Sequence, residues 1–376
     1  MDLFINILLL FSACVGGFLL PLTVVNRLFS WLSDSKFKAF LEVLLYLLSF
    51  IIPVWLCWAA YSQDRTILSS LSATPVLFLG IAPLWMTFAA YTCSDIFTHL
   101  KGKPVIPEAS ISQSTCPYQM RPEDPGIFMP AMNRIYQLDR TLLRIEIDGL
   151  NPDLRGLRFG HLTDFHLGKH CHRNFLKHAV DLIMAEKPDL IGITGDFVNF
   201  RKYMDDCFDD LAELAAPLGI YAVRGNHDYW VGADLIEQRI EALGFVLLDD
   251  KTLELHKDSH PFILSGTEQR WKKDPPDVDH FCSDSSLLKI VLAHTPDDFP
   301  LLVGHNPHLV ICGHTHGGQV CFPFFGPVVV PSVYGRRYAS GLFKEKESLL
   351  YVSRGIGCYP PFRMLCNPEI TIVEFV

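Results

Sequence analysis

The sequence predicts a layered α/β domain with packed β-sheets, preceded by N-terminal transmembrane helices. Short apolar runs alternate with amphipathic segments between residues 157 and 243, and strand-rich sequence with Gly and Pro follows. The first 93 residues, in contrast, are apolar over long stretches. Alternating strands and helices are typical of α/β folds, in which helices cover the faces of a sheet.

Five apolar runs have the length and composition of buried strands, and each is bounded by Gly or by helix signals. They are residues 157–162, 190–194, 220–223, 289–293 and 309–312. Apolar residues recur at helical spacing in three further segments. We therefore expect helices at residues 173–187, 204–216 and 233–243.

The N-terminal region carries few charges. Residues 1–100 hold four basic and five acidic side chains, whereas the whole chain has 32 and 41. Residues 3–25, 39–61 and 75–93 each reach the length of about 20 residues that a helix needs to cross a bilayer. We expect about three transmembrane helices in a membrane region, residues 1–93. For the third stretch, which contains two prolines and a glycine, the alternative is a buried helical hairpin.

Basic residues between these stretches predict their orientation. Arg27, Lys36 and Lys38 follow the first stretch, whereas Asp64 and Arg65 cancel after the second. The positive-inside bias then places everything after residue 93 in the cytoplasm, and two spans instead of three would reverse this. Eleven scattered cysteines agree with a reducing compartment.

Two further parts of the chain follow the membrane region. Residues 94–140 contain six prolines with Ser and Thr between them and show no sustained period, so we expect a Pro-rich linker of irregular structure. Residues 141–376 then form the α/β domain. The net charge of -9 argues against a nucleic-acid partner, because such proteins concentrate Lys and Arg on one face. No protein partner is predicted.

Five short motifs directly follow the five predicted strands. They are Asp164-x-His166, Gly195-Asp196, Gly225-Asn226-His227-Asp228, His294 and Gly313-His314-Thr315-His316. Residues just past the ends of parallel strands converge on one edge of a sheet. Carboxylate, amide and neutral imidazole groups together suit divalent ions of intermediate softness. The sequence therefore predicts a divalent-metal site.

The order of the motifs resembles the calcineurin-like metallophosphoesterase family from about residue 155 onward. The resemblance implies a metallophosphoesterase-type sandwich of two mixed β-sheets flanked by helices, with two divalent metal ions. Carried over by position, the metal ligands are Asp164, His166 and His316 for one ion, Asn226, His294 and His314 for the second, and Asp196 bridging both. The family suggests manganese, and the donor set also accepts iron or zinc.

The same resemblance implies hydrolysis of a phosphoester, because two such ions activate water for an in-line attack on phosphorus. Asp196 and His227 are the expected catalytic residues, with His227 as a general acid beside the substrate. In the family an Asp three residues after the Gly-Asp motif commonly orients this histidine. Asn199 occupies that position here, and an amide does not offset imidazolium charge as a carboxylate does.

A structural role competes with metal binding for every single histidine. We assign a structural or surface role to His161, His170, His172 and His178, and a solvated loop to His256, His260 and His280. Cys171 beside His172 is a weak zinc signal, since no Cys-x-x-Cys pair accompanies it. At the motifs, the order of seven ligand types after matching strands favours metal binding.

The segment after the last motif, residues 317–338, is strongly apolar and ends in two arginines. It either covers the core, forms a wall for acyl chains or touches the bilayer. Arg336, Arg337 and Arg354 are candidate substrate-binding residues for phosphate oxygens, with a structural role as the alternative for each.

The closing segment, residues 350–372, resembles a membrane-associated bacterial branch of the family. Some members hydrolyse the pyrophosphate of UDP-2,3-diacylglucosamine in lipid A biosynthesis. We therefore expect this reaction at the cytoplasmic face of the cell inner membrane, on a membrane lipid or lipid-linked nucleotide. The alternatives are a broader phosphodiesterase or phosphatase of the same fold, and a non-catalytic metal-binding membrane scaffold.

Overall fold

The computed structural model describes residues 86, 106–268, 287–323, 326–327 and 330–376. Apart from Met86, the three stretches expected to cross a membrane lie outside the described residues, as does His280. Among the residues described, no helix combines the length and the apolar character that a membrane span requires.

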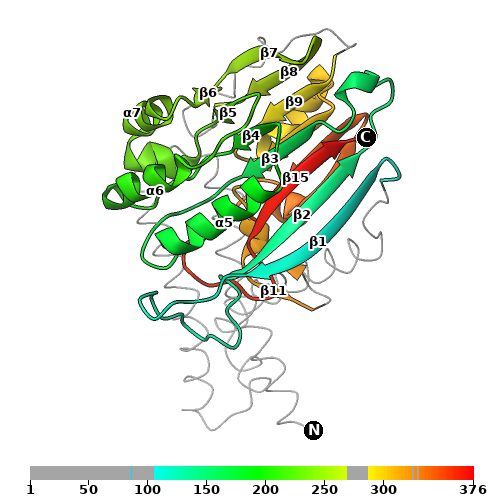
Figure 1. Ribbon diagram of the computed structural model, residues 1–376. Helices are drawn as coiled ribbons and strands as arrows, with labels where there is room; N and C mark the ends of the chain where they lie inside the picture. Colours follow the sequence, from blue (N-terminus) through cyan, green and yellow to red (C-terminus); the bar gives the residue numbers. More distant parts are fainter. Residues whose placement is uncertain (1–85, 87–105, 269–286, 324–325, 328–329) are drawn as a thin grey trace, which may run out of the picture. The chain divides into compact units, whose positions relative to one another are not determined.

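The first sheet of the described domain has seven strands (Figure 1). Their order across the sheet is β1 (Ala109–Pro117), β2 (Gln137–Ile145), β15 (Glu369–Phe375), β3 (Arg158–Leu162), β4 (Leu190–Ile193), β5 (Ile220–Ala222) and β6 (Val246–Leu247). Strands β3 to β6 are parallel, whereas β15 runs antiparallel to β3 and β1 antiparallel to β2. The carboxyl ends of the four parallel strands therefore share one edge.

The second sheet is also mixed and has six strands. Their order is β13 (Gly341–Glu345), β14 (Ser348–Val352), β10 (Leu309–Cys312), β9 (Lys289–Leu292), β8 (His260–Gly266) and β7 (Lys251–Lys257). The four central strands are parallel, and β13 and β7 pair antiparallel at the edges. A small hairpin, β11 (Cys321–Phe322) with β12 (Gly326–Pro327), lies outside both sheets.

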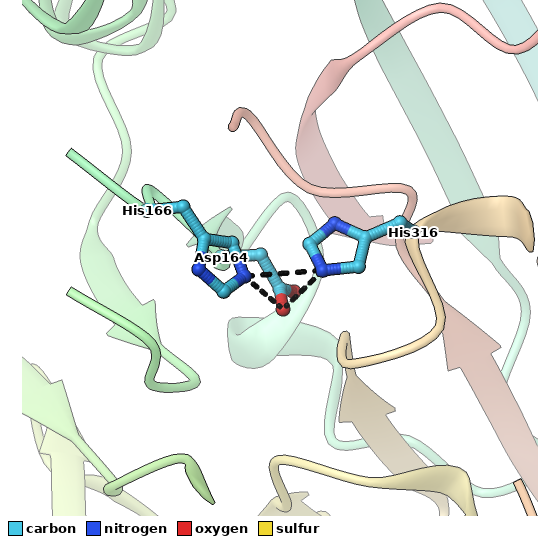
Figure 2. Close-up of side chains that lie close together, drawn as sticks. All are labelled: Asp164, His166 and His316. Atoms are coloured by element: carbon cyan, nitrogen blue, oxygen red, sulfur yellow. Dashed lines mark hydrogen bonds and ion pairs between the residues drawn. The ribbon is translucent and has the colours of Figure 1, made fainter. Parts of the chain in front are cut away.

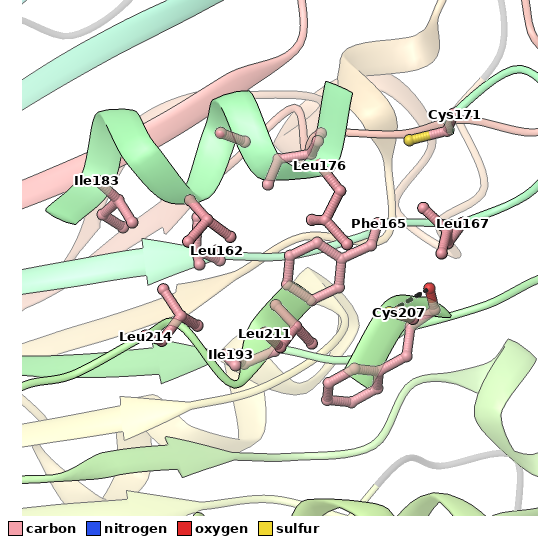
Figure 3. Close-up of a cluster of buried hydrophobic side chains, with 14 of the residues drawn as sticks. Leu162, Phe165, Leu167, Cys171, Leu176, Ile183, Ile193, Cys207, Leu211 and Leu214 are labelled. Carbon is pink, nitrogen blue, oxygen red and sulfur yellow. Dashed lines mark hydrogen bonds between the residues drawn. The ribbon is translucent and has the colours of Figure 1, made fainter. Parts of the chain in front are cut away.

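Buried side chains join the layers. Phe159 and Val373 of the first sheet pack in one cluster with Leu264, Ile290 and Ile311 of the second, so the sheets lie face to face. Another cluster joins the outer face of the first sheet to α5 (Arg173–Ala185) and α6 (Met204–Leu211) (Figure 3), and also to α7 (Asn226–Ala242). A third joins the second sheet to α8 (Phe299–Leu302). The expected sandwich of two mixed sheets flanked by helices is confirmed.

Short 3₁₀ helices complete the described structure. They are Pro152–Leu154, Arg201–Tyr203, Pro296–Asp298, Val303–His305, His316–Gly318 and Gly335–Tyr338. The five predicted strands correspond to β3, β4, β5, β9 and β10, and the bounds differ by at most one residue. His256 and His260, expected in a loop, instead lie on β7 and β8.

Two helices differ from their predicted ranges by more than two residues. The helix expected at residues 233–243 begins earlier, at Asn226. Residues 226–231 contain the site motif and have no apolar face, so the helical pattern did not reveal them. Gly232, with φ 135° and ψ 94°, kinks the helix at that point. The helix expected at residues 204–216 ends at Leu211, and residues 212–216 lead to Pro217 without helical structure.

Residues 94–140, expected to be irregular, contain β1 and the start of β2. β1 pairs with β2 along its whole length, and its side chains are largely exposed. A polar edge strand buries neither face, so Ser110, Ser112 and Ser114 leave no apolar alternation for the sequence to reveal.

The close approach of the two sheets predicts the effect of one added methyl group. A Cβ at Gly192 of β4 would lie 2.4 Å from Cζ of Phe159 and 3.0 Å from Cδ2 of Leu292. We expect Gly192→Ala to lower the free energy of unfolding by about 1–3 kcal/mol in urea denaturation. Gly304→Ala is the control, because nothing lies within 4 Å of its added Cβ. Equal effects of the two substitutions would contradict this packing.

Candidate metal centre

The seven predicted ligands come together at the edge where parallel strands of both sheets end. Asp164 and His166 follow β3, Asp196 follows β4, and Asn226 begins α7 after β5. From the second sheet, His294 follows β9, and His314 and His316 follow β10. All seven side chains are buried. The two sheets thus contribute ligands to one cluster.

The backbone at the cluster is held in an unusual conformation. Five of the predicted ligands have a positive φ between 45° and 68°, namely Asp164, His166, Asp196, His314 and His316. Residues with a Cβ rarely adopt this left-handed region, and it persists only where the surroundings enforce it. A close approach is one such constraint, since a Cβ at Gly195 would lie 2.3 Å from the backbone nitrogen of Gly225.

Asp164, His166 and His316 form the first group (Figure 2). The Nε2 atoms of the two histidines are 3.1 Å apart, and they lie 3.8 Å and 3.6 Å from Oδ1 of Asp164. Oδ2 of Asp164 accepts hydrogen bonds from Thr163 Oγ1 and the His314 backbone N–H. Oδ1 is buried without a hydrogen-bond partner among the residues described. A cation between these three atoms would satisfy that oxygen, so the group fits a metal ion.

His294 is the centre of the second group. Its Nε2 lies 3.2 Å from Oδ1 of Asn226 and 3.1 Å from Nδ1 of His314. Its Nδ1–H donates to the backbone carbonyl of Thr194 at 2.5 Å, which directs Nε2 toward the other ligand atoms. A backbone carbonyl on the outer nitrogen is a common means of orienting a metal-binding histidine.

Asp196 lies between the two groups. Its Oδ2 is 3.4 Å from Nε2 of His166 and 3.5 Å from Nε2 of His294. Its Oδ1 accepts the backbone N–H of His227 at 2.8 Å. One carboxylate oxygen therefore faces both groups, which is the position of a bridging ligand.

His314, His316 and Asp164 have charge states that suit cations. Burial lowers the pKa of His314 to about 4, and it also takes the pKa of His316 well below its ordinary value. Burial alone would raise the pKa of Asp164, but the imidazole of His316 and that of His166 outweigh it and hold it low. Ionised carboxylates and neutral imidazoles are the forms that bind metal.

His294 shows the excess of negative charge in the cluster. Burial would lower its pKa, yet Asp196, and to a smaller extent Asp164, raise it to about 10. A proton on His294 therefore balances carboxylate charge that a divalent ion would otherwise balance. Such a proton must leave when a cation binds through Nε2.

His227 lies at the edge of the cluster and is half-buried. Its ring centroid is 4.6 Å from that of His166 and 4.4 Å from that of Trp230. Burial lowers its pKa to about 4, so the neutral imidazole is the dominant form near pH 7. Asn199, at the position from which an Asp is expected to orient His227, instead bonds His166.

Sequence reasoning missed two buried supports of the cluster. The carboxylate of Asp228 accepts the backbone N–H groups of Asp196, Phe197 and Gly225, and its place after His227 in the motif was the available signal. Arg363 is fully buried and donates to the backbone carbonyl of His316, with Nη2 3.5 Å from His316 Nδ1. No pattern in the sequence links Arg363 to the motifs.

The three arginines proposed to bind substrate have different surroundings. Arg354 pairs with Asp139 of β2 at 2.9 Å and Glu369 of β15 at 2.8 Å, which ties these strands together. Arg337 is exposed and pairs with Glu345 at 2.6 Å. Arg336 lies beside Arg337 in the 3₁₀ helix Gly335–Tyr338. Contact of Arg336, Arg337 or Arg354 with a substrate stays a prediction.

The fold and the cluster define a metal-dependent phosphoester hydrolase. The chain belongs to the calcineurin-like phosphoesterase family, whose model matches residues 157–318. It is 34% identical to the phosphodiesterase YaeI of Escherichia coli (strain K12) over 223 residues, which cover 57% of this chain and 80% of YaeI.

Two more distant relatives differ in their described roles. The UDP-2,3-diacylglucosamine pyrophosphatase LpxG of Chlamydia muridarum (strain MoPn / Nigg) is 27% identical, over 59% of this chain and 84% of LpxG. A transmembrane protein with a metallophosphoesterase domain from Danio rerio is 25% identical, over 77% of this chain and 73% of the relative.

The buried His161, on β3 beside the cluster, should make the free energy of unfolding depend on pH. It is buried, its Nε2 lies 2.8 Å from Thr194 Oγ1, and burial lowers its pKa to about 3. Between pH 6.5 and 3 the unfolded chain binds the proton and the folded chain does not, so stability falls as the pH falls.

We expect His161→Gln to reduce the slope of unfolding free energy against pH by up to about 1.4 kcal/mol per pH unit between pH 6 and 4. Urea denaturation of metal-free protein measures the slope. His256→Gln, which changes a half-exposed side chain on β7, is the control. An unchanged slope in His161→Gln would show that this histidine is protonated in the folded chain.

Proposed function

We propose that this hydrolase is anchored in the membrane and hydrolyses UDP-2,3-diacylglucosamine to UMP and 2,3-diacylglucosamine 1-phosphate (lipid X). Water adds to one phosphorus, the bond from that phosphorus to the bridging oxygen breaks, and the released proton passes to the phosphate products or solvent. The domain after residue 105 then faces the cytoplasm, where uridine nucleotides are available. Manganese is the proposed ion, with iron or zinc as chemically suitable substitutes.

The proposed ligand sets follow the geometry of the cluster. They are Asp164, His166 and His316 for one ion, Asn226, His294 and His314 for the other, and Asp196 for both. When bound, two divalent ions supply an activated water and neutralise charge on the phosphoryl oxygens. Neutral His227, at the edge of the cluster, donates a hydrogen bond to a phosphoryl or leaving oxygen.

Exposed aromatic side chains, some beside the cluster and one in the apolar segment after the last motif, carry the proposal of a lipid substrate. Trp230, 57% exposed, contacts the ring of His227. Phe200, 51% exposed, directly follows Asn199 and lies 6.4 Å from the ring of Tyr359, which is 56% exposed. Phe322, in the apolar segment after the last motif, is 50% exposed. Apolar surface next to a phosphoester site suits a substrate that carries both a phosphate and acyl chains.

The relatives and the sequence add support. LpxG is described as acting on UDP-2,3-diacylglucosamine, and the Danio rerio relative is described as a transmembrane protein. The three apolar stretches within residues 1–93 would confine enzyme and lipid to one surface and so raise their effective concentration.

A broader phosphodiesterase activity is the second candidate. YaeI, at 34% identity, is more similar to this chain than LpxG is, and it is described as a phosphodiesterase. The two functions differ in the substrate, because only the lipid substrate carries acyl chains that the exposed apolar side chains could contact.

Substrate preference separates the two candidates. Full-length protein in detergent with Mn²⁺ is given UDP-2,3-diacylglucosamine, UDP-N-acetylglucosamine as the matched substrate without the two long acyl chains, and a soluble aryl diester. We expect UMP release from the acylated substrate with a kcat/KM at least about 100-fold above the others, since burying acyl chains adds several kcal/mol. Comparable values for all three would favour the broader phosphodiesterase.

The exposed aromatics should matter for the lipid alone. Phe200→Ala combined with Tyr359→Ala is expected to lower the ratio of lipid to soluble-diester activity about tenfold, because lost apolar contact of about 1.4 kcal/mol corresponds to that factor. Val246→Ala, which changes an exposed apolar residue of β6, is the control. An unchanged ratio would remove the support that these side chains give to a lipid substrate.

Asp196 tests catalysis against a scaffold role. We expect Asp196→Asn, like treatment with a chelator, to abolish hydrolysis of every phosphoester, because an amide cannot bridge two cations as a carboxylate does. Added Mn²⁺ should restore chelated wild-type protein but not the variant. Full function of Asp196→Asn in cells would favour the metal-binding scaffold.

A further inference from the structure

Asn199 holds His166 at two points. Its Oδ1 lies 2.8 Å from Nδ1 of His166, and its Nδ2 donates to the backbone carbonyl of His166 at 3.1 Å. Because an amide oxygen can only accept, Nδ1 of His166 must carry the proton of this bond. Nε2 is then the nitrogen that faces Asp164, Asp196 and His316.

Neighbouring bonds keep Asn199 in place. The backbone N–H of Asn199 donates to the carbonyl of Leu167, and Leu167 forms a β-bridge with Val198. The segments after β3 and β4 therefore run side by side beyond the ends of their strands. The amide of Asn199 bonds across these segments to the side chain and the backbone of one candidate ligand.

The second group is supported differently. His294 is oriented by the backbone carbonyl of Thr194, a contact that does not involve Asn199. A change of the Asn199 side chain thus removes the outer partner of His166 and leaves that of His294 intact. The two metal positions are separable at this residue.

We propose that Asn199 is a positioning residue for the metal position of Asp164, His166 and His316, and that the position of Asn226, His294 and His314 is independent of it. The outer partner of a metal-binding histidine fixes its tautomer and ring orientation, and its loss typically weakens metal binding about 10–100-fold. The inference rests on the metal centre of the proposed function but not on any substrate.

Metal binding, measured without substrate, tests this role. The experiment uses full-length wild-type protein, Asn199→Ala and Asn199→Asp, each stripped of metal with chelator and titrated with Mn²⁺. Elemental analysis counts the bound ions, and electron paramagnetic resonance detects spin coupling between two neighbouring ions. We expect two Mn²⁺ per wild-type chain with a spin-coupled spectrum. In Asn199→Ala one ion should bind with wild-type affinity, whereas the ion at the position of Asp164, His166 and His316 should bind at least about tenfold more weakly. The spectrum should be uncoupled when only the tight position is filled.

Asn199→Asp distinguishes positioning from general damage. Aspartate keeps an oxygen that accepts the hydrogen bond from Nδ1 of His166. We therefore expect two bound ions and a coupled spectrum, with an affinity at the position of Asp164, His166 and His316 at least equal to that of wild type. Asn174→Ala, which removes an amide bonded to Asp124 on another part of the surface, is the matched control and should bind both ions normally. Thermal unfolding of the metal-free forms verifies that each variant is folded.

The outcomes are distinct. Two tightly bound, coupled ions in Asn199→Ala would overturn the inference, as would equal weakening of both positions. If Asn199→Ala fails to fold, Asn199→Asp decides the matter. Weaker binding than wild type at the position of Asp164, His166 and His316 then overturns the inference, and equal or tighter binding supports it. A wild-type protein that binds no second ion would instead contradict the metal centre of the proposed function.

Discussion

The rest of the site depends on the position of the Asp196 carboxylate between the two groups of predicted ligands. One oxygen is held by the backbone N–H of His227, and the other is within 3.5 Å of imidazole nitrogens from both groups. This requires β4 to end between the other ligand-bearing strands and the chain to turn sharply at Gly195, where a Cβ would collide with the backbone of Gly225. Asp228 completes the arrangement by accepting the N–H of Asp196 itself.

Electrostatics explains why so many polar groups can be buried at one place. Two carboxylates without cations are balanced in part by imidazoles, as the raised pKa of His294 shows. The exchange of such protons for divalent ions relieves the cost of burying unpaired charge. The left-handed backbone at five of the predicted ligands has a further energetic cost, which the surrounding structure must offset.

Much of the fold could be predicted from the sequence because buried strands leave a strong signal. The runs before Asp164, Asp196 and His294 are short, apolar and sharply bounded, and the motifs then follow from the topology of parallel strands. β1 could not be predicted, because an exposed edge strand needs no apolar pattern. The hydrogen bond between Asn199 and His166 could not be predicted either, since a bond between two loops depends on how closely β3 and β4 end beside each other.

The predicted ligands are divided between the two sheets, with Asp164, Asp196 and Asn226 on one and His294 and His316 among those on the other. A cation held by both sheets acts as a cross-link near the carboxyl ends of their strands. Loss of metal would then lower the stability of that edge, although the apolar cluster between the sheets still holds the layers together. A metal-bound chain would in this way be more stable than the metal-free chain, by an amount that the affinity and concentration of the metal determine.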